Sequence, residues 1–384
     1  MIASRQLRMA AAAAGGIALA FGLAVAQEAD EDKFIADAPP ERFVGPNTEI
    51  NKELGCSKCH LEEFKAWQTT HHNHSIGMPD TPLAKAMRKK FKIRNLQRDK
   101  LCQNCHFTVV KEGGEEVAKY GISCESCHGP AAEWAGVHSN EEKWGKDQRE
   151  VRLKLAEEKG MIRPANLYKL AQNCYQCHIM AKNPQGTTVS VEEMVNTKFK
   201  VKKKKKKKKK KKYHRASTKG FELVAYSQGE VRHNLRNKAR ENRPSRFLRG
   251  LYVVGKMLDV EYSLRALSNA TDPDGRYFKK IKERLDGEGN ALAALEAIRS
   301  KLPGDHPVAG AIDEIVAAAK AAPLEVKQRE ALLAAASKVR AAARRIFDGK
   351  SEEEMLALEK ELAPVDPLLP PPEKYKGTPY QVTQ

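Results

Sequence analysis

Residues 121–130 read Gly-Ile-Ser-Cys-Glu-Ser-Cys-His-Gly-Pro, a stretch with two cysteines three positions apart and a histidine directly after the second. The same Cys-x-x-Cys-His unit occurs four times and uses all eight cysteines of the 384-residue chain. The units are Cys56, Cys59 and His60; Cys102, Cys105 and His106; Cys124, Cys127 and His128; and Cys174, Cys177 and His178. Any account of the cysteines therefore has to explain this repeated unit.

A Cys-x-x-Cys-His unit is the attachment sequence of a c-type haem. Two cysteines at this spacing lie on one turn of chain, so their sulfurs can form thioethers to the two vinyl groups of one porphyrin. The histidine that follows can then bind the iron. Zinc half-sites or a disulfide framework are the alternatives, but neither explains a histidine at the same offset four times. We therefore predict four covalently bound haems, with proximal ligands His60, His106, His128 and His178.

The four units lie between Cys56 and His178, which leaves only about thirty residues for each haem. So little protein cannot insulate four macrocycles, so we expect them to touch or nearly touch and to replace much of the apolar core. This predicts a mainly α fold whose first part, residues 27–240, is a haem-packed domain with sparse regular structure. Its candidate helices are residues 61–69, 82–91 and 149–159.

The second half of the chain has a different pattern, which begins after Pro244. Apolar residues such as Phe247, Leu251 and Leu258 recur at helical spacing, and they predict an amphipathic helix over residues 246–268. Further helices are predicted at residues 277–285, 291–302, 308–321, 324–347 and 352–362, separated by glycine and proline. We expect an all-α bundle over residues 241–365 that supports the haem domain, followed by a Pro-rich extended tail at residues 366–384.

The first residues have the composition of a secretory signal peptide. Arg5 and Arg8 precede an apolar stretch that ends in Ala24-Val-Ala26. We predict that residues 1–26 are this signal peptide, with an uncleaved membrane anchor as the alternative. The expected location is outside the cytoplasmic membrane, in the periplasm or associated with the membrane or cell surface, and c-type haem is attached on that side.

The formal net charge of +19 would ordinarily suggest a nucleic-acid partner. Lys202, however, opens an unbroken run of eleven lysines that ends at Lys212, and without this run the charge falls to +8. The excess of basic residues thus comes mostly from one stretch of the chain, and we expect no nucleic-acid partner. We predict that residues 202–212 form a solvated loop, because like charges repel. The alternative is a docking site for an acidic redox partner protein or an anionic lipid surface.

The remaining histidines are candidates for the second axial ligand that electron-transfer haems need. Of the 11 histidines four are proximal, and His306 lies far from the haem region, in a loop where we expect a surface residue. The other six lie in or just beyond the haem region: His71, His72, His74, His138, His214 and His233. The composition of the chain does not choose among them.

Several stretches resemble the family of multihaem cytochromes related to the tetrahaem cytochrome c-554 of nitrifying bacteria. Residues 67–72, Trp-Gln-Thr-Thr-His-His, and the stretch 121–130 carry the resemblance, together with Trp134-Ala-Gly-Val-His138. Residues 221–234, which end in Arg-His-Asn, resemble a longer subgroup. The resemblance covers roughly residues 55–267.

This resemblance implies distal ligands. Carried over residue by residue, it assigns the role to His72, with His74 as its rival, and to His138 and His233. His214 is the fourth candidate, although the lysine run and Tyr213 stand where the family has Gly-Gly. With all four haems closed by two histidines, the protein would store and relay electrons, which is the function we predict.

Two other functions stay open at this point. If one haem lacks a distal ligand, it could take nitric oxide, hydroxylamine or nitrite, and the protein would be a redox enzyme. In the nitrifier relative the open haem is the second, which corresponds here to the haem on His106. The third possibility is a subunit of a multihaem cytochrome filament or complex.

Overall fold

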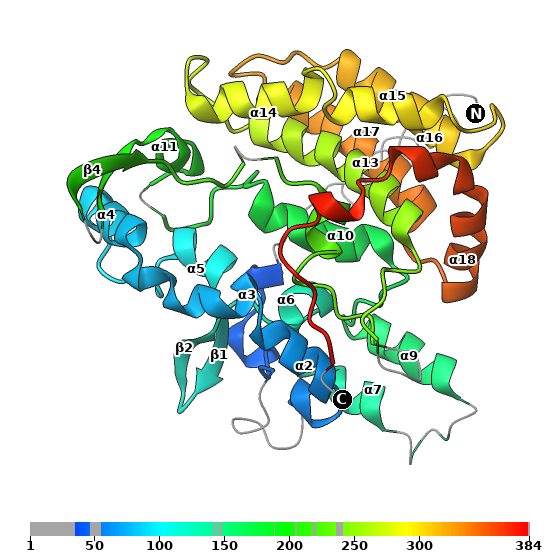
Figure 1. The fold of residues 1–384 in the computed structure, drawn as a ribbon, viewed down its shortest axis with the longest axis horizontal. Helices are drawn as coiled ribbons and strands as arrows, with labels where there is room; N and C mark the ends of the chain where they lie inside the picture. Colours follow the sequence, from blue (N-terminus) through cyan, green and yellow to red (C-terminus); the bar gives the residue numbers. More distant parts are fainter. Residues whose placement is uncertain are drawn as a thin grey trace, which may run out of the picture.

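The computed structural model describes residues 35–46, 55–140, 143, 145, 148–187, 189–203, 206–217, 220–235 and 241–382. The predicted signal peptide lies outside these residues. The fold is mainly α-helical, with two short antiparallel β-hairpins in the described part (Figure 1). This confirms the predicted fold class. Within the same residues, no helix combines the length and apolar character needed to cross a bilayer.

The first part of the chain contains short helices connected by long loops. All three predicted helices are present, and α4 has the same bounds as the prediction. Its N-cap is Thr81, whose hydroxyl accepts a hydrogen bond from the Ala84 amide, and Pro82 occupies the first helical position. The helices are α2 (Leu61–Gln68), α3 (His71–His74), α4 (Pro82–Phe91), α5 (Lys100–His106), α6 (Glu125–His128), α7 (Ala135–Ser139), α9 (Arg149–Glu158), α10 (Leu167–His178), α11 (Val191–Asn196) and α12 (Leu223–Ser227).

The second part is a helical bundle, as predicted. Its helices are α13 (Leu248–Leu267), α14 (Arg276–Asp286), α15 (Ala291–Arg299), α16 (Pro307–Lys320), α17 (Arg329–Phe347) and α18 (Glu352–Glu361). Helix α17 begins later than the predicted residue 324, because Lys327 has a left-handed backbone with φ of 65°. The predicted amphipathic character of α13 is wrong: the helix is buried on nearly all sides from Gly250 to Leu267. It lies in the centre of the bundle and contacts α10, α14, α15 and α17.

One continuous apolar core joins the bundle to the part of the chain that contains the four Cys-x-x-Cys-His units, here called the haem-attachment region. It includes Leu167, Tyr168 and Tyr175 of α10 together with most of α13. The Tyr175 hydroxyl donates a 2.6 Å hydrogen bond to the carbonyl oxygen of Gly255, so the two helices approach closely there. The predicted domain boundary between residues 240 and 241 stays a prediction, and apolar packing crosses it.

The C-terminal segment runs back over the first part of the chain. Short 3₁₀ turns at Ala363–Leu368 and Pro372–Lys374 are followed by extended backbone. The Lys376 amide donates to the carbonyl of Ala225 over 2.8 Å, and the Tyr380 hydroxyl bonds Glu62 of α2 over 3.2 Å. In Figure 1 this red segment descends from the bundle to α2. It therefore ties the bundle to the haem-attachment region.

The prediction of a solvated loop is wrong for the described lysines of the run, which lie in the two strands of a β-hairpin. Strand β3 (Phe199–Lys203) pairs antiparallel with β4 (Lys206–Lys212), and Val201 is opposite Lys210. Phe199 and Val201 are buried, and the Phe199 ring meets Phe91 of α4 edge-on at 5.6 Å. The apolar side chains of β3 thus anchor it, and β4 satisfies its backbone groups against that strand. The other hairpin joins β1 (Thr108–Glu112) to β2 (Glu115–Tyr120).

Candidate haem-binding site

The Cys-x-x-Cys-His units lie on single helical turns. The last three proximal histidines, His106, His128 and His178, are the final residues of α5, α6 and α10. In the first unit, Cys56–Lys58 is a 3₁₀ turn, and His60 immediately precedes α2. Residues three apart on a helical turn share a face. The local fold therefore presents both sulfurs of a unit on one side, as attachment to one porphyrin requires.

Each proximal histidine ring faces one other histidine ring. The partner comes from a distant part of the chain in every case, and the four centroid separations are nearly equal. They are 6.2 Å for His60 and His138, and 6.3 Å for His72 and His178, for His106 and His214, and for His128 and His233. Each of the four distal candidates favoured by the resemblance is thus paired with a different unit.

These separations fit an iron atom between the two rings. With a metal–imidazole bond of about 2.0–2.1 Å and a ring nitrogen about 1.1 Å from its centroid, two opposed ligands have centroids about 6.3 Å apart. Direct van der Waals stacking of imidazoles would be much closer. The proximal and distal residues therefore fit a bis-histidine haem at each of the four units.

The histidines are also held in the form that binds metal. Burial lowers the pKa of His106, His138 and His214 to about 4 and that of His178 to about 3. Burial likewise lowers the pKa of His72. These imidazoles are therefore neutral at pH 7, and neutral imidazole is the ligating form.

Backbone carbonyls orient the pair formed by His128 and His233. His128 Nδ1 lies 3.1 Å from the carbonyl oxygen of Ile162, and His233 Nδ1 lies 2.8 Å from that of Val231. A hydrogen bond at Nδ1 fixes the tautomer whose Nε2 is free to bind metal. Both rings of this pair therefore have the partner that haem ligands usually have.

The other two histidines of α3 have different surroundings from His72. His71 Nδ1 lies 2.7 Å from a carboxylate oxygen of Glu230, and His74 is exposed. Among the described residues, the histidine ring that faces His178 is that of His72. The expectation that His306 is a surface residue is wrong, because its side chain is only 8% exposed and its Nδ1 caps α16 by accepting from the Val308 amide.

Contacts between the units give their order in space. The Cys124 thiol hydrogen-bonds to Cys56 and thereby lowers the pKa of Cys56, so the first and third units adjoin. The Asn173 side chain of α10 donates to the Cys127 carbonyl over 2.9 Å, which joins the third unit to the fourth. The Cys177 thiol lies 3.8 Å from the Asn104 carbonyl, which joins the fourth to the second. The units thus follow the order first, third, fourth, second.

One buried carboxylate supports the third unit and was not foreseen from the sequence. Glu125 is 1% exposed and accepts hydrogen bonds from the amides of Val44 (3.0 Å), Gly45 (2.8 Å) and Ala131 (2.7 Å). Burial raises the pKa of Glu125, and these amides oppose that rise. Its place between two haem-attaching cysteines is the one sequence signal that could have pointed to it.

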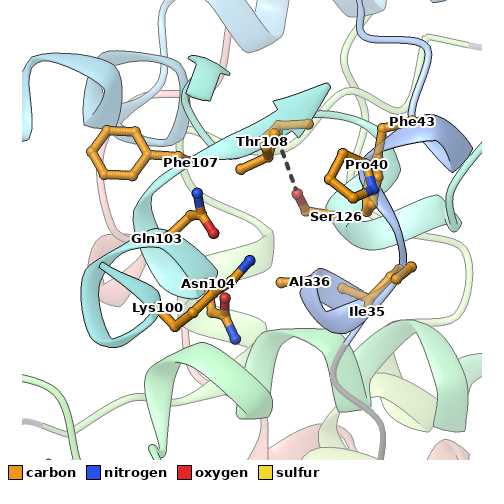
Figure 2. A pocket seen from close by; sticks show the side chains of 12 residues that line it. Ile35, Ala36, Pro40, Phe43, Lys100, Gln103, Asn104, Phe107, Thr108 and Ser126 are labelled. Atoms are coloured by element: carbon orange, nitrogen blue, oxygen red, sulfur yellow. Dashed lines mark hydrogen bonds between the residues drawn. The ribbon is translucent and has the colours of Figure 1, made fainter. Parts of the chain in front are cut away.

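A cavity lies beside the second and third units but contains none of the paired histidines. Figure 2 shows its lining, which includes Gln103 and Asn104 from α5 and the hydroxyls of Thr108 and Ser126, 3.4 Å apart. The side-chain oxygens of Gln103 and Asn104 are buried and have no hydrogen-bond partner in the described part of the chain. These buried polar atoms suit ordered water, while the rest of the lining is largely apolar.

Gly129, directly after His128, has a backbone that only glycine tolerates well. Its φ is +93°, and a Cβ there would lie 2.1 Å from the carbonyl oxygen of Gly160. We expect Gly129→Ala to cost at least about 2 kcal/mol of unfolding free energy in urea denaturation followed by circular dichroism. Gly136→Ala in α7, where a Cβ would meet nothing within 4 Å, is the matched control and should be neutral or slightly stabilising. Equal effects of the two substitutions would contradict this account.

Comparison with known proteins agrees with this arrangement. The family described as "Cytochrome c554 and c-prime" matches residues 55–129. Cytochrome c-554 of Nitrosomonas europaea is 26% identical over 137 residues, which cover 32% of this chain and 55% of that protein, so the chain spans about half the length of this relative. No solved structure matches the chain. The chain is thus related to the cytochrome c-554 family, and this relation implies covalently bound haem.

Proposed function

We propose that the chain is an exported tetrahaem c-type cytochrome that relays electrons between redox partners in the periplasm. Four opposed histidine pairs at 6.2–6.3 Å are the observation that carries this proposal. Each Cys-x-x-Cys-His unit would attach one haem, and the facing histidine would be the second ligand. A bound haem supplies reversible one-electron chemistry at its iron.

The pair formed by His106 and His214 favours a carrier over an enzyme. A redox enzyme that acts on a nitrogen oxide needs an iron with a free coordination position. The His214 ring faces His106 at 6.3 Å and is half-buried, which supports closure of that haem from both sides. If both histidines of each pair bound iron, no coordination position would be left for a small substrate.

The protein's own residues would set the path and the potentials. The order first, third, fourth, second supports a linear relay through the molecule, because neighbouring units contact each other. The Phe221 ring stacks on His178 at 4.3 Å with an interplanar angle of 10°, so it holds that ligand in one orientation. Two histidine ligands keep the potential lower than histidine with methionine would.

Mass and spin state test the proposal directly. We expect the purified protein to carry the mass of four covalent haems and to lack residues 1–26. In the ferric state, electron paramagnetic resonance should give low-spin signals alone, and the reduced protein should not bind carbon monoxide. A high-spin ferric signal from intact protein would instead support the enzyme, and any other number of haems would contradict the proposal.

A further inference from the structure

Two neighbouring elements, α4 and the hairpin β3–β4, carry a group of exposed basic side chains, here called the basic face. Its exposed members are Arg88, Lys89, Lys90, Lys92, Lys198, Lys200, Lys210, Lys211 and Lys212. Within the described part of the chain, none of these nine side chains forms a salt bridge, so their charge is uncompensated.

Apolar packing holds the two parts of the basic face together. Met87 and Phe91 on the inner side of α4 belong to the same core as Phe199 and Val201 of β3. Strand β3 contacts α4 directly, and Figure 1 shows the hairpin and α4 in the same corner of the molecule. A lysine-rich segment that is paired in a sheet and packed on a helix presents its charges in a fixed arrangement, which a solvated loop would not do.

The basic face adjoins one particular haem site. Strand β4 ends at Lys212, two residues before His214, and two residues span at most about 7 Å of chain. Tyr213, the residue between them, lies 4.9 Å from the Arg276 guanidinium through a cation–π contact, which fixes this short connection. His214 faces His106 in the second unit, and that unit ends the spatial order of the four.

From this juxtaposition we infer that the basic face docks an acidic redox protein, and that electrons pass between that protein and the haem held by His106 and His214. The inference rests on the proposed function. A docking surface for electron transfer belongs at the end of a relay and beside a haem, and the basic face meets both conditions. Uncompensated positive charge at that position steers a negatively charged partner and raises the association rate.

A protein partner is favoured over a lipid surface. Peripheral membrane binding commonly adds apolar side chains that insert among the lipids. In the described part of the chain, the exposed large apolar side chains are Leu61 and Val151, and neither belongs to the basic face.

The test compares charge-reversal variants of the haem-loaded full-length protein. One replaces Lys210, Lys211 and Lys212 with glutamate, and the control replaces Lys301, Lys338 and Lys360, which are exposed on the second half of the chain. Reduced flavodoxin serves as the acidic protein and neutral lumiflavin semiquinone as the uncharged reductant. At an ionic strength of about 10 mM the first variant should be reduced by flavodoxin about 10- to 100-fold more slowly than wild type, and the difference should vanish near about 1 M salt.

The other measurements distinguish a failure of the proposed function from a failure of the docking inference. The control variant should change the flavodoxin rate less than about two-fold, and lumiflavin should reduce all variants equally. A second variant, with Arg88, Lys89 and Lys90 changed to glutamine, should slow flavodoxin in the same direction. Failure of lumiflavin to reduce the haems would overturn the proposed function, whereas equal flavodoxin rates in all variants would overturn the docking inference alone. Lysine-dependent binding to phosphatidylserine vesicles without any effect on flavodoxin would assign the face to lipid.

Discussion

If four haems are bound as proposed, replacing His214 with alanine is expected to open the one attached at Cys102 and Cys105 and to leave the other three closed. The His214 ring is the one that faces His106, at 6.3 Å, and its removal deletes the sixth ligand of that iron. A ferric haem with one histidine is high-spin, so about a quarter of the iron should change its spin state. Electron paramagnetic resonance measures this, and the reduced variant should bind one equivalent of carbon monoxide.

Two controls make this experiment decisive. Added imidazole should refill the open position of the His214→Ala protein and restore the low-spin spectrum. His74→Ala should leave the spectrum unchanged, because His74 is exposed and the histidine ring that faces His178 is that of His72. A His214→Ala protein that stays wholly low-spin would mean that another residue closes the haem on His106. A high-spin signal from His74→Ala would reverse the assignment of His72.

The proximal half of each site could be predicted from the sequence because it is local. Two cysteines and a histidine within five residues lie on one helical turn, whatever the rest of the chain does, as in α10 with Cys174, Cys177 and His178. The distal half is not local. His138, His214 and His233 reach their partners across long stretches of chain, so the sequence indicates which histidines are candidates but not which unit each one faces.

The position of His214 could not be predicted from the sequence because of the lysine run that precedes it. Eleven like charges predict a solvated loop, and a residue after such a loop has no defined position. In the structure, buried Phe199 and Val201 fix β3, and β4 pairs with it up to Lys212. The hairpin therefore determines where Tyr213 and His214 lie. Tertiary packing of two apolar residues outweighed the local repulsion that the sequence pattern indicated.

The helical bundle was predicted closely because apolar periodicity and Gly or Pro interruptions mark its helices. The burial of α13 on nearly all sides was not predicted, because the helix contains charged residues such as Asp259, Glu261 and Arg265. In the sequence, these charged residues indicate a solvent-exposed face of the helix. In the structure they are buried and paired, Asp259 with Arg284 of α14 and Glu261 with Arg265 and with Arg340 of α17. Ion pairs between helices thus allow a charged helix to occupy the centre of the bundle.

Glu261→Gln is accordingly expected to be among the most destabilising single substitutions in the bundle. Glu261 is 0% exposed and accepts from Arg265 over 2.8 Å, from Arg340 over 3.2 Å and from the Tyr168 hydroxyl over 2.7 Å. The substitution keeps the shape but removes the carboxylate that neutralises two buried guanidinium groups. Breaking a buried ion pair by removing one partner costs about 3–5 kcal/mol. Urea denaturation followed by far-ultraviolet circular dichroism measures this loss of unfolding free energy.

The matched control is Glu314→Gln, which removes an exposed ion pair with Arg345 between α16 and α17. Such surface pairs contribute about 0–1 kcal/mol, so the control should unfold almost like wild type. Because Tyr168 belongs to α10, which ends at His178, loosening of this network should also shift the absorbance of the haem attached there, while Glu314→Gln should not. A loss below about 1 kcal/mol in Glu261→Gln would show that the two arginines find other acceptors. The bundle would then be held to α10 by apolar packing and the hydrogen bond from Tyr175 to Gly255, and α13 would tolerate charge in its interior for a different reason.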